Sequence, residues 1–352
     1  MIEVNNPLVS VIVTNYNYGH YLQRCLLSII GQTYRRVEII LCDNASTDNS
    51  VDIANAIALS SPIPIQIICQ KRNIGSAGNY RTGEAQVRGD YFLNFGADDF
   101  MDPNYLKYAV GMLEGYPGAS QFITHLNVVD EVGEISSAIP FFDGSYLIKG
   151  YKYAELLMMA GVTRHTSQTV WRTSAHQEIS SQPDYIYSHA IGERTTAFMH
   201  ACQWDVIYCD RPLVACRESE ANETSRLNKR GIQTIEQLLV IHQMADHAER
   251  IGLIGVAKKR IQAVNKIGEI SLRYGIEELQ VGNMEIASIY LMLGAIYLEK
   301  FKNLFKKYNS SVKIDKKIWL EINEWLSEEI VEKQKIRSNS YMPPRESMKI
   351  SI

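Results

Sequence analysis

The sequence lacks long apolar runs, a leader-like N-terminus and closely spaced cysteines. Its nearest approach to a membrane span, residues 286–298, is 13 residues long between two glutamates, whereas a spanning helix needs about 20. The first six residues have neither the basic start nor the apolar core of a signal peptide. There is no Cys-x-x-Cys pair, and Cys25, Cys42 and Cys69 lie inside apolar runs. We therefore expect a cytoplasmic protein whose cysteines are reduced core residues, neither disulfides nor zinc ligands.

Neither sign of charge dominates the chain. Charged residues make up 21% of the sequence and the formal net charge is -3. A general nucleic-acid binder would show a strong basic excess, so we expect no nucleic-acid partner. With 352 residues, 46% of them apolar, the chain is long enough for one large domain or two smaller ones.

Apolar, β-branched segments alternate with helical patterns in the first hundred residues. Strands are expected at 9–14, 37–42, 65–69 and 91–95, separated by helices near 21–30 and 50–59 and by one after residue 79. Four alternations at intervals of about 25–30 residues predict an α/β fold with a mostly parallel, doubly wound sheet. The polar loops that follow these strands would then share one edge of the sheet, where ligands bind in such folds.

The fourth of these strands ends in two adjacent carboxylates, Asp98 and Asp99. Adjacent carboxylates repel each other unless a cation or hydrogen bonds offset their charge. Mg²⁺ and Mn²⁺ prefer oxygen ligands and often keep a nucleotide phosphate as a further ligand. A divalent metal site is therefore one interpretation, and a solvated Asp-Asp turn before the helix at Asp102 is the other.

The other loops offer groups suited to a nucleotide. Tyr16 could stack on a base, and Asp43 could accept a hydrogen bond from a base or ribose. Asn73 and Gly75 would let the backbone approach a diphosphate, and Arg81 could offset its charge. Each residue also has an ordinary interpretation as a cap, a turn residue or a solvated side chain. Four such loops on one edge favour a binding site.

The ordered motifs resemble the family 2 glycosyltransferases, which have the GT-A nucleotide-sugar fold. The resemblance spans about residues 5–220 and rests on the segments 9–17, 43–48, 73–75 and 97–99. It implies a nucleoside diphosphate sugar donor, with a UDP-sugar favoured, and a glycan or lipid-linked glycan acceptor. It also implies inversion at the transferred sugar and a role in surface polysaccharide assembly.

The resemblance assigns roles to individual residues. The loop Thr14-Asn15-Tyr16 and Asp43 would hold the nucleobase, and Ala97 and Asp98 would belong to the motif that holds the metal and diphosphate. The first position of that motif, often Asp, is Gly96 here. Binding of Mn²⁺ or Mg²⁺ would therefore rest on Asp98, assisted by Asp99 and water.

The catalytic base is expected further along the chain. Residues 206–214 resemble a segment of the family that follows its catalytic acid. Counting back from Asp210 in that pattern places the catalytic acid at Glu193, with Asp184 as the reserve candidate. An inverting transfer needs one carboxylate to deprotonate the acceptor hydroxyl. His165 is a candidate sugar contact, with a structural role as the alternative. Residues 217–225 resemble the loop that closes over the donor.

The remaining sequence is predicted to be helical, in segments starting near 232 and then near 254–274, 278–307 and 315–335. We expect a catalytic domain over 1–225, a helical region over 226–336 and a flexible tail over 337–352. Residues 300–317 are rich in lysine and aromatic residues. They could contact the inner face of a membrane as a peripheral surface, or pack on the core or on a second subunit in a homodimer.

These observations predict a nucleotide-sugar-dependent glycosyltransferase. Two alternatives stay open at this point. One is a sugar nucleotidyltransferase, although the loop at 15–19 lacks the basic residues expected of its phosphate loop. The other is a non-catalytic nucleotide-sugar-binding or scaffold subunit of a glycan-assembly complex, for which Gly96 is the argument.

Overall fold

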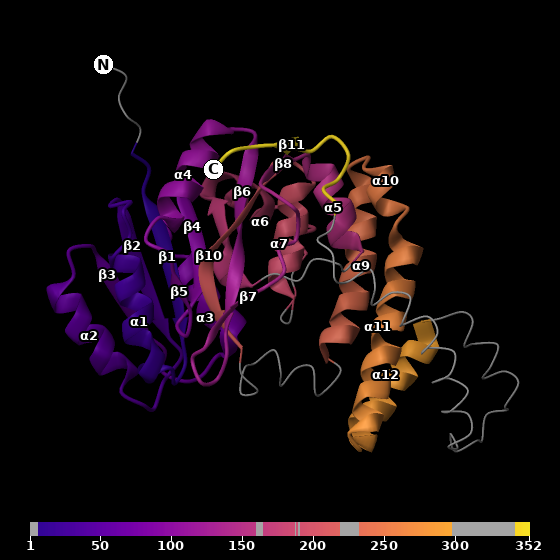
Figure 1. Cartoon of the computed structure of the whole chain (residues 1–352), viewed down its shortest axis with the longest axis horizontal. Coiled ribbons are helices and arrows are strands. Elements are labelled where there is room, and N and C mark those ends of the chain that lie inside the picture. The colour runs from indigo at the N-terminus through magenta and orange to yellow at the C-terminus, as the bar shows by residue number, and fades with distance from the viewer. Residues whose placement is uncertain (1–5, 160–164, 187, 189–190, 219–231, 298–341) are drawn as a thin grey trace, which may run out of the picture.

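A computed structural model describes residues 6–159, 165–186, 188, 191–218, 232–297 and 342–352. Its sheet is built from eleven strands (Figure 1). They are β1 (Val9–Asn15), β2 (Val37–Asp43), β3 (Ile65–Cys69), β4 (Tyr91–Gly96), β5 (Phe100–Met101), β6 (Ala119–Val129), β7 (Ile135–Ser137), β8 (Tyr146–Ile148), β9 (Thr169–Arg172), β10 (Asp205–Arg217) and β11 (Met348–Lys349). The four strands expected in the first hundred residues are confirmed.

The sheet is mixed, with a parallel centre. Its order is β11-β8-β10-β6-β9-β4-β1-β2-β3, and β5 and β7 pair with β10 and β6. The long strands run parallel to one another, whereas the short strands pair antiparallel to them, as β9 does between β4 and β6. The carboxyl ends of the long strands therefore meet along one edge, at the bottom of Figure 1.

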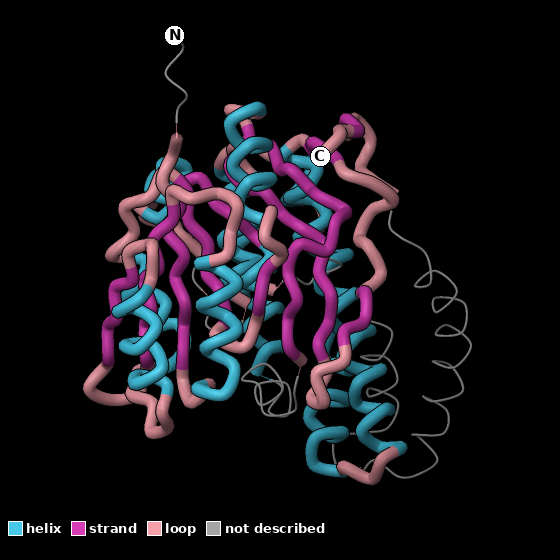
Figure 2. The backbone as a smooth tube through the Cα atoms, turned by 60° about the vertical axis from the view of Figure 1, so that its left-hand side comes forward, coloured by secondary structure: helices cyan, strands magenta, loops and turns pink. Residues whose placement is uncertain are grey.

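Helices cover both faces of the sheet (Figure 2). The helices of this region are α1 (Gly19–Ile30), α2 (Ser50–Ser60), α3 (Gly75–Glu84), α4 (Tyr105–Gly115), α5 (Gly150–Met158), α6 (Thr173–Ser180) and α7 (Gly192–Ala201). Alternate side chains of β1 point to opposite faces of the sheet. Val11 and Val13 belong to the core that includes α1 and α4, and Ile12 belongs to the core that includes α5, α6 and α7. This two-sided burial explains the continuous apolar strands.

One helix lies unusually close to the sheet. A Cβ on Gly83 in α3 would come within 2.5 Å of Ile12 Cγ2 and 2.9 Å of Cys42 Sγ. Glycine is therefore required there for α3 to pack against β1 and β2. Cys25 and Cys42 are buried as expected, but Cys69 is exposed, because β3 is the edge strand and only partly covered.

The C-terminal region is helical, as predicted. It contains α9 (Ile232–Arg250), α10 (Ile254–Ala257), α11 (Arg260–Gln280) and α12 (Met284–Tyr297). The break expected between 274 and 278 is wrong, because α11 runs through it and ends before Gly282, whose φ of 87° suits a helix end. Gly275 lies within α11, where a Cβ would meet Leu291 Cγ of α12 at 2.5 Å. Among the described helices, none has the length and hydrophobicity needed to cross a membrane.

The structure differs from the expected flexible tail at residues 342–352. β11 pairs antiparallel with β8, and Ile350 N–H donates to Ser145 O at 3.0 Å. Ile350 and Ile352 also pack against the core. Two apolar side chains and a strand pairing hold this segment on the domain, a long-range contact that the local sequence does not signal. The helices predicted at 300–307 and 315–335, and the lysine-rich segment 300–317, lie outside the described residues.

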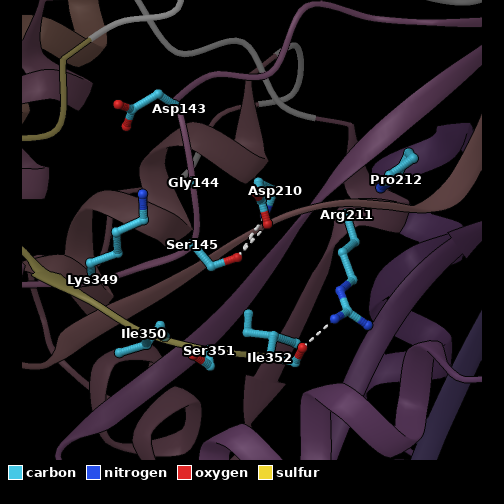
Figure 3. Close-up of a pocket in the computed structure, with 10 residues that line it drawn as sticks. All are labelled: Asp143, Gly144, Ser145, Asp210, Arg211, Pro212, Lys349, Ile350, Ser351 and Ile352. Carbon is cyan, nitrogen blue, oxygen red and sulfur yellow. Dashed lines mark hydrogen bonds between the residues drawn. The ribbon is translucent and has the colours of Figure 1, made fainter.

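The docked segment lines a recess with residues of β10 and of the loop before β8 (Figure 3). Pro212 interrupts the β6–β10 pairing, so Asp210 and Arg211 form a bulge in β10. Asp210 accepts a hydrogen bond from Ser145, and Arg211 donates to the backbone oxygen of Ile352. The bulge thus bonds to the docked segment through Arg211 and to the loop before β8 through Asp210.

Candidate active site

Asp43 is the last residue of β2 and pairs with Asn15, the residue before Tyr16. Its carboxylate is 2% exposed and accepts hydrogen bonds from Asn15 Nδ2 at 2.7 Å, from Ser46 N–H at 2.9 Å and from the Ser46 hydroxyl. Ala45, with a φ of 62°, turns the backbone so that Ser46 faces the carboxylate. Asp43 therefore holds the loops after β1 and β2 together, and the exposed Tyr16 is the accessible member of the group.

A second cluster of amides orders the loop before α3. Asn44 donates to Asn73 Oδ1 at 3.0 Å and accepts from Ile74 N–H at 2.9 Å, and Gly75 N–H donates to Asn73 Oδ1 at 2.9 Å. Gly75 has a φ of 79° and open space where a Cβ would stand. Asn73 and Gly75 are exposed at the start of α3, and Arg81 is exposed in its last turn. The predicted phosphate-side residues thus share one accessible segment.

The two carboxylates after β4 differ in environment. Asp99 is 1% exposed, and it accepts hydrogen bonds from the Ser167 hydroxyl and from Arg217 N–H at 3.0 Å. Asp98 is half-buried, and burial and the Asp99 charge raise its pKa to about 6. Asp98 is therefore the more accessible carboxylate, and its charge is under-compensated by the protein.

Gly96 departs from the family motif for a visible steric reason. A Cβ at this position would lie 2.9 Å from an oxygen of Asp98 and 2.9 Å from an oxygen of Asp99. The amide of Gly96 also donates to Ser167 Oγ at 3.1 Å, and Ala97 N–H donates to Thr14 O at 3.3 Å. The turn is thus held against β1, and a side chain at its first position would require the carboxylates of Asp98 and Asp99 to shift.

These residues fit a divalent cation. The raised pKa of Asp98 indicates a carboxylate whose ionised form lacks compensating positive charge. A cation bound by Asp98 would supply that charge, and carboxylate oxygens are the ligands that Mg²⁺ and Mn²⁺ prefer. Both oxygens of Asp99 have protein partners, so its part as a second ligand for such a hard ion stays a prediction.

Glu193 lies in the first turn of α7 and is partly exposed. α7 leads into β10, a strand parallel to β4, so it begins at the carboxyl edge of the sheet. The next residue, Arg194, is buried and donates to the carbonyls of Leu157 at 2.8 Å and Met158 at 3.0 Å. These bonds bind the last turn of α5 and fix the start of α7, and with it the carboxylate of Glu193.

Asp184, the reserve candidate for the base, faces the C-terminal helices. Its carboxylate is bound by His247 Nδ1 at 2.5 Å and by Arg250 at 2.9 Å, both from α9. The hydrogen bond from His247 is the main cause of its lowered pKa. Asp184 thus joins α9 to the α/β domain, and its role as the reserve candidate for the base, like that of Glu193, stays a prediction.

A buried polar chain that the sequence did not indicate links α3 to α7. Tyr80 donates to Glu84 at 2.8 Å, and Glu84 contacts His176 Nε2 at 2.8 Å. His176 Nδ1 lies 3.3 Å from His200 Nε2, and His200 Nδ1 lies 2.9 Å from Ser120 Oγ. Its members come from four separate segments, so no spacing in the sequence reveals them.

The hydrogen-bonded side chains that begin at Tyr80 also interact electrostatically with Glu193, the candidate base. Burial raises the pKa of Tyr80, and the charges of Glu84 and Glu193 add to the rise. Tyr80 therefore lies near both carboxylates, between the buried histidines and the start of α7.

His165 lies beside Asp99, with His165 Nδ1 3.3 Å from Asp99 Oδ2. Residues 160–164, which precede it, lie outside the described residues, as do 219–225 of the predicted donor loop. Arg217, at the start of that loop, places its guanidinium 4.1 Å from the ring centroid of Tyr21. The described part of the loop is therefore anchored on α1.

Comparisons with known proteins agree with this geometry. Residues 10–174 match the family Glycosyl transferase family 2. The putative glycosyltransferase EpsE of Bacillus subtilis is 30% identical over 174 residues, which cover 46% of this chain and 63% of EpsE. The chain spans 37% of the length of another curated glycosyltransferase that it matches. These relatives are therefore matched over less than two thirds of their length.

Solved structures share the fold. S. aureus TarS residues 1–349, in complex with UDP-GlcNAc, superpose with a TM-score of 0.53 at 14% identity, covering 80% of this chain and 90% of TarS 1–349. The mannosyltransferase PcManGT from Pyrobaculum calidifontis, in complex with GDP-Man and Mn²⁺, gives 0.50 at 15% identity, covering 86% and 89%. The predicted GT-A fold is confirmed, and the similarity to glycosyl transferase family 2 spans residues 10–174.

Proposed function

We propose that this protein transfers a sugar from a nucleoside diphosphate sugar to a hydroxyl group of a glycan or lipid-linked glycan, with inversion. The observation that carries the proposal is the turn after β4. There an under-compensated Asp98 lies at the same sheet edge as the loops of Asp43 and Gly75. This arrangement suits a ligand that has a base, a diphosphate and a cation.

Donor binding follows from the three loops. The ring of Tyr16 is 41% exposed and can stack on a base, and Asp43 orders the loop that presents it. Gly75 and Asn73 form an accessible segment for the diphosphate at the start of α3, where the helix dipole favours negative charge. We favour a UDP-sugar. UDP-GlcNAc is bound by TarS and GDP-Man by PcManGT, and both therefore belong in a donor panel.

The transfer step needs a base and a stabilised leaving group. Glu193 would accept the proton of the acceptor hydroxyl. At the same time, the hydroxyl oxygen of the acceptor would form a bond to the anomeric carbon of the donor sugar. The bond from that carbon to the diphosphate oxygen breaks at the same time, and the nucleoside diphosphate leaves with the electron pair. Mn²⁺ or Mg²⁺ held by Asp98 would supply positive charge for the departing diphosphate.

A panel of nucleotide sugars, with and without added Mn²⁺ or Mg²⁺, tests the proposal. Release of nucleoside diphosphate from one donor would identify that donor and exclude the scaffold alternative. Release of pyrophosphate from a nucleoside triphosphate and a sugar phosphate would favour the nucleotidyltransferase instead. Donor binding with no turnover in the presence of glycan acceptors would favour the scaffold.

We also propose a peripheral contact with a membrane through residues 300–317, near a lipid-linked acceptor. The support is the clustering of lysines and aromatic residues in the sequence. The protein should then sediment with anionic vesicles at low salt and be released as salt rises, because ions screen surface charge. Equal recovery of the protein in the supernatant with anionic and neutral vesicles would contradict the membrane contact. If residues 300–317 instead pack against a second subunit, analytical sedimentation of the protein alone should show a homodimer.

A further inference from the structure

Three side chains of different chemistry meet behind the turn after β4. They are the carboxylate of Asp99, the imidazole of His165 and the thiol of Cys216. One ligand atom from each lies within 4.8 Å of the other two. We propose that this cluster is a binding site for Zn²⁺ or a similar transition-metal cation, separate from the hard-metal position at Asp98.

The cluster contains a ring nitrogen that the protein itself leaves unsatisfied. His165 Nδ1 is a buried atom with no hydrogen-bond partner, although it lies 3.3 Å from Asp99 Oδ2. Asp99 and Cys216 are 1% and 2% exposed, whereas the side chain of His165 is 37% exposed. The nitrogen thus lies on the side of the cluster, while another part of the ring reaches solvent.

Neighbouring groups already orient two of the ligands. Arg217 N–H donates to Asp99 Oδ1 at 3.0 Å, and the Ser167 hydroxyl donates to Asp99 Oδ2. The backbone N–H of His165 donates to Gln168 Oε1 at 2.8 Å. Metal ligands in proteins are commonly held by such outer hydrogen bonds, which fix the direction of their lone pairs.

The chemistry of the three ligand atoms determines which kind of cation can bind. Thiolate and imidazole are ligands for Zn²⁺ and related transition metals, whereas Mg²⁺ requires oxygen ligands. Zinc–ligand bonds of about 2.0–2.3 Å need the ligand atoms about 3–4 Å apart, so the cluster must contract only slightly. Burial and the charges of Asp99 and Asp98 raise the pKa of the Cys216 thiol in the metal-free protein, where it also hydrogen-bonds to Asp99. The charge of the bound cation would offset these effects, so that Cys216 binds as the thiolate and its proton leaves to solvent. A fourth position would be open to water, as in exchangeable zinc sites.

The proposed site does not depend on the proposed transferase activity. It shares Asp99, the predicted second ligand of the hard metal, whose oxygens face Ser167 and Arg217, and it leaves Asp98 free. The sequence offers no signal for it, because its ligands are separated by 66 and 51 positions along the chain.

Titration of the metal-free full-length chain with Co²⁺, a spectroscopic substitute for zinc, tests the proposal. Coordination by Cys216 should produce thiolate-to-cobalt charge-transfer absorption in the near ultraviolet, saturating at about one Co²⁺ per chain. Addition of Zn²⁺ should displace the cobalt and remove the absorption. Mg²⁺ in excess should leave it unchanged.

Matched variants assign the ligands. Cys216→Ser should abolish the absorption, whereas Cys209→Ser, a buried thiol on the same strand, should retain it. Asp98→Asn should also retain it, which separates this site from the hard-metal position. Zinc X-ray absorption of the wild-type protein should show one sulfur ligand at about 2.3 Å, and this holds even if Cys216→Ser fails to fold. Absence of sulfur ligation in the wild type, or a charge-transfer band that survives Cys216→Ser, would overturn the proposal.

Discussion

Asn15 Nδ2 donates to Asp43 Oδ1 at 2.7 Å, joining the last residues of two neighbouring parallel strands. Both side chains are 2% exposed, and Asn15 Oδ1 is a buried atom with no hydrogen-bond partner. Asp43 thus orders Asn15 and the loop that follows it. The direct contact of Asp43 with a base stays a prediction.

Asp43→Asn should weaken binding of the nucleoside diphosphate by about tenfold and lower the free energy of unfolding by about 1–3 kcal/mol. Both effects follow because the variant lacks the charged acceptor for Asn15 and Ser46. Glu38→Gln is the matched control, since Glu38 is a buried carboxylate on β2 that binds Ser10 and Arg88 at the opposite end of the strand. Calorimetry should show lower stability in both variants and weaker affinity only in the first. Unchanged affinity in Asp43→Asn would remove it from the donor site.

Asp98→Asn should stabilise the metal-free protein above pH 6 by about 1–3 kcal/mol. The pKa of Asp98 is raised to about 6 in the folded chain, so the folded state holds a proton that the unfolded state has lost between about pH 4 and 6. Wild-type stability therefore falls as pH rises through that window, and the variant escapes this loss. Added Mn²⁺ should stabilise the wild type and not the variant.

Urea unfolding at pH 5 and pH 7, with and without Mn²⁺, measures both effects. Asp102→Asn is the control, because Asp102 is an exposed carboxylate in the same segment. Equal stabilisation of Asp98→Asn and wild type by Mn²⁺ would show that the metal is held elsewhere.

Glu193→Gln should lower kcat by about 10²–10⁴-fold, because glutamine keeps the shape but is a poor proton acceptor. Donor affinity should change little, since the base acts on the acceptor. Steady-state kinetics with the identified donor, together with calorimetry of nucleotide binding, gives both quantities. If kcat and donor affinity fall together, Glu193 instead maintains the shape of the donor site.

Asp184→Asn provides the comparison for the base. Its carboxylate binds His247 and Arg250, so the change should reduce thermal stability while kcat stays near the wild-type value. Its pKa is lowered in the fold, so its contribution to stability is present above the unfolded pKa and is lost as pH falls. A large loss of kcat in Asp184→Asn, with Glu193→Gln near normal, would exchange the two roles.

His200→Gln should flatten the pH dependence of stability below pH 6.5. Burial lowers the pKa of His200 well below its usual value, and the neighbouring His176 adds to the shift. As pH falls below about 6.5, His200 binds a proton in the unfolded chain but stays neutral in the folded chain. The free energy of unfolding therefore decreases as pH falls below about 6.5. The slopes of wild type and variant should differ by up to about 1.4 kcal/mol per pH unit. Parallel slopes from urea unfolding between pH 5 and 7 would show that His200 is not held neutral.

Periodicity along the chain predicted the parts of the fold that depend on local sequence. The β-branched runs at β1 and β2 are buried on both faces, and that burial is what their continuous apolar pattern signals. The docking of β11 on β8 could not be predicted, because it depends on a partner about 200 residues away. The sequence suggested a helix break near Gly275, because glycine usually weakens a helix. In the structure α11 continues through Gly275, and the missing side chain leaves space for Leu291 of α12.

The candidate site was predictable where motif residues follow a strand directly, as Asp43 and Asp98 do. Its supporting contacts were not. Ser167 and Arg217 reach Asp99 from distant segments, and the histidine chain joins α3, α6 and α7. Sequence spacing identifies groups that share one turn or strand, whereas these contacts appear only once the layers are packed.

The pairing of β8 with β11 bears on the order in which the chain can fold. Tyr146 pairs with Tyr208 on one side and with Lys349 on the other. During synthesis, the outer backbone groups of β8 have no strand partner until residues 348–349 emerge, long after the loops that carry Asp43 and Gly75. An unpaired strand edge readily joins another chain, and closing so long a loop is slow. The outer edge of β8 is therefore open to association with other chains until the C-terminal segment docks and covers it.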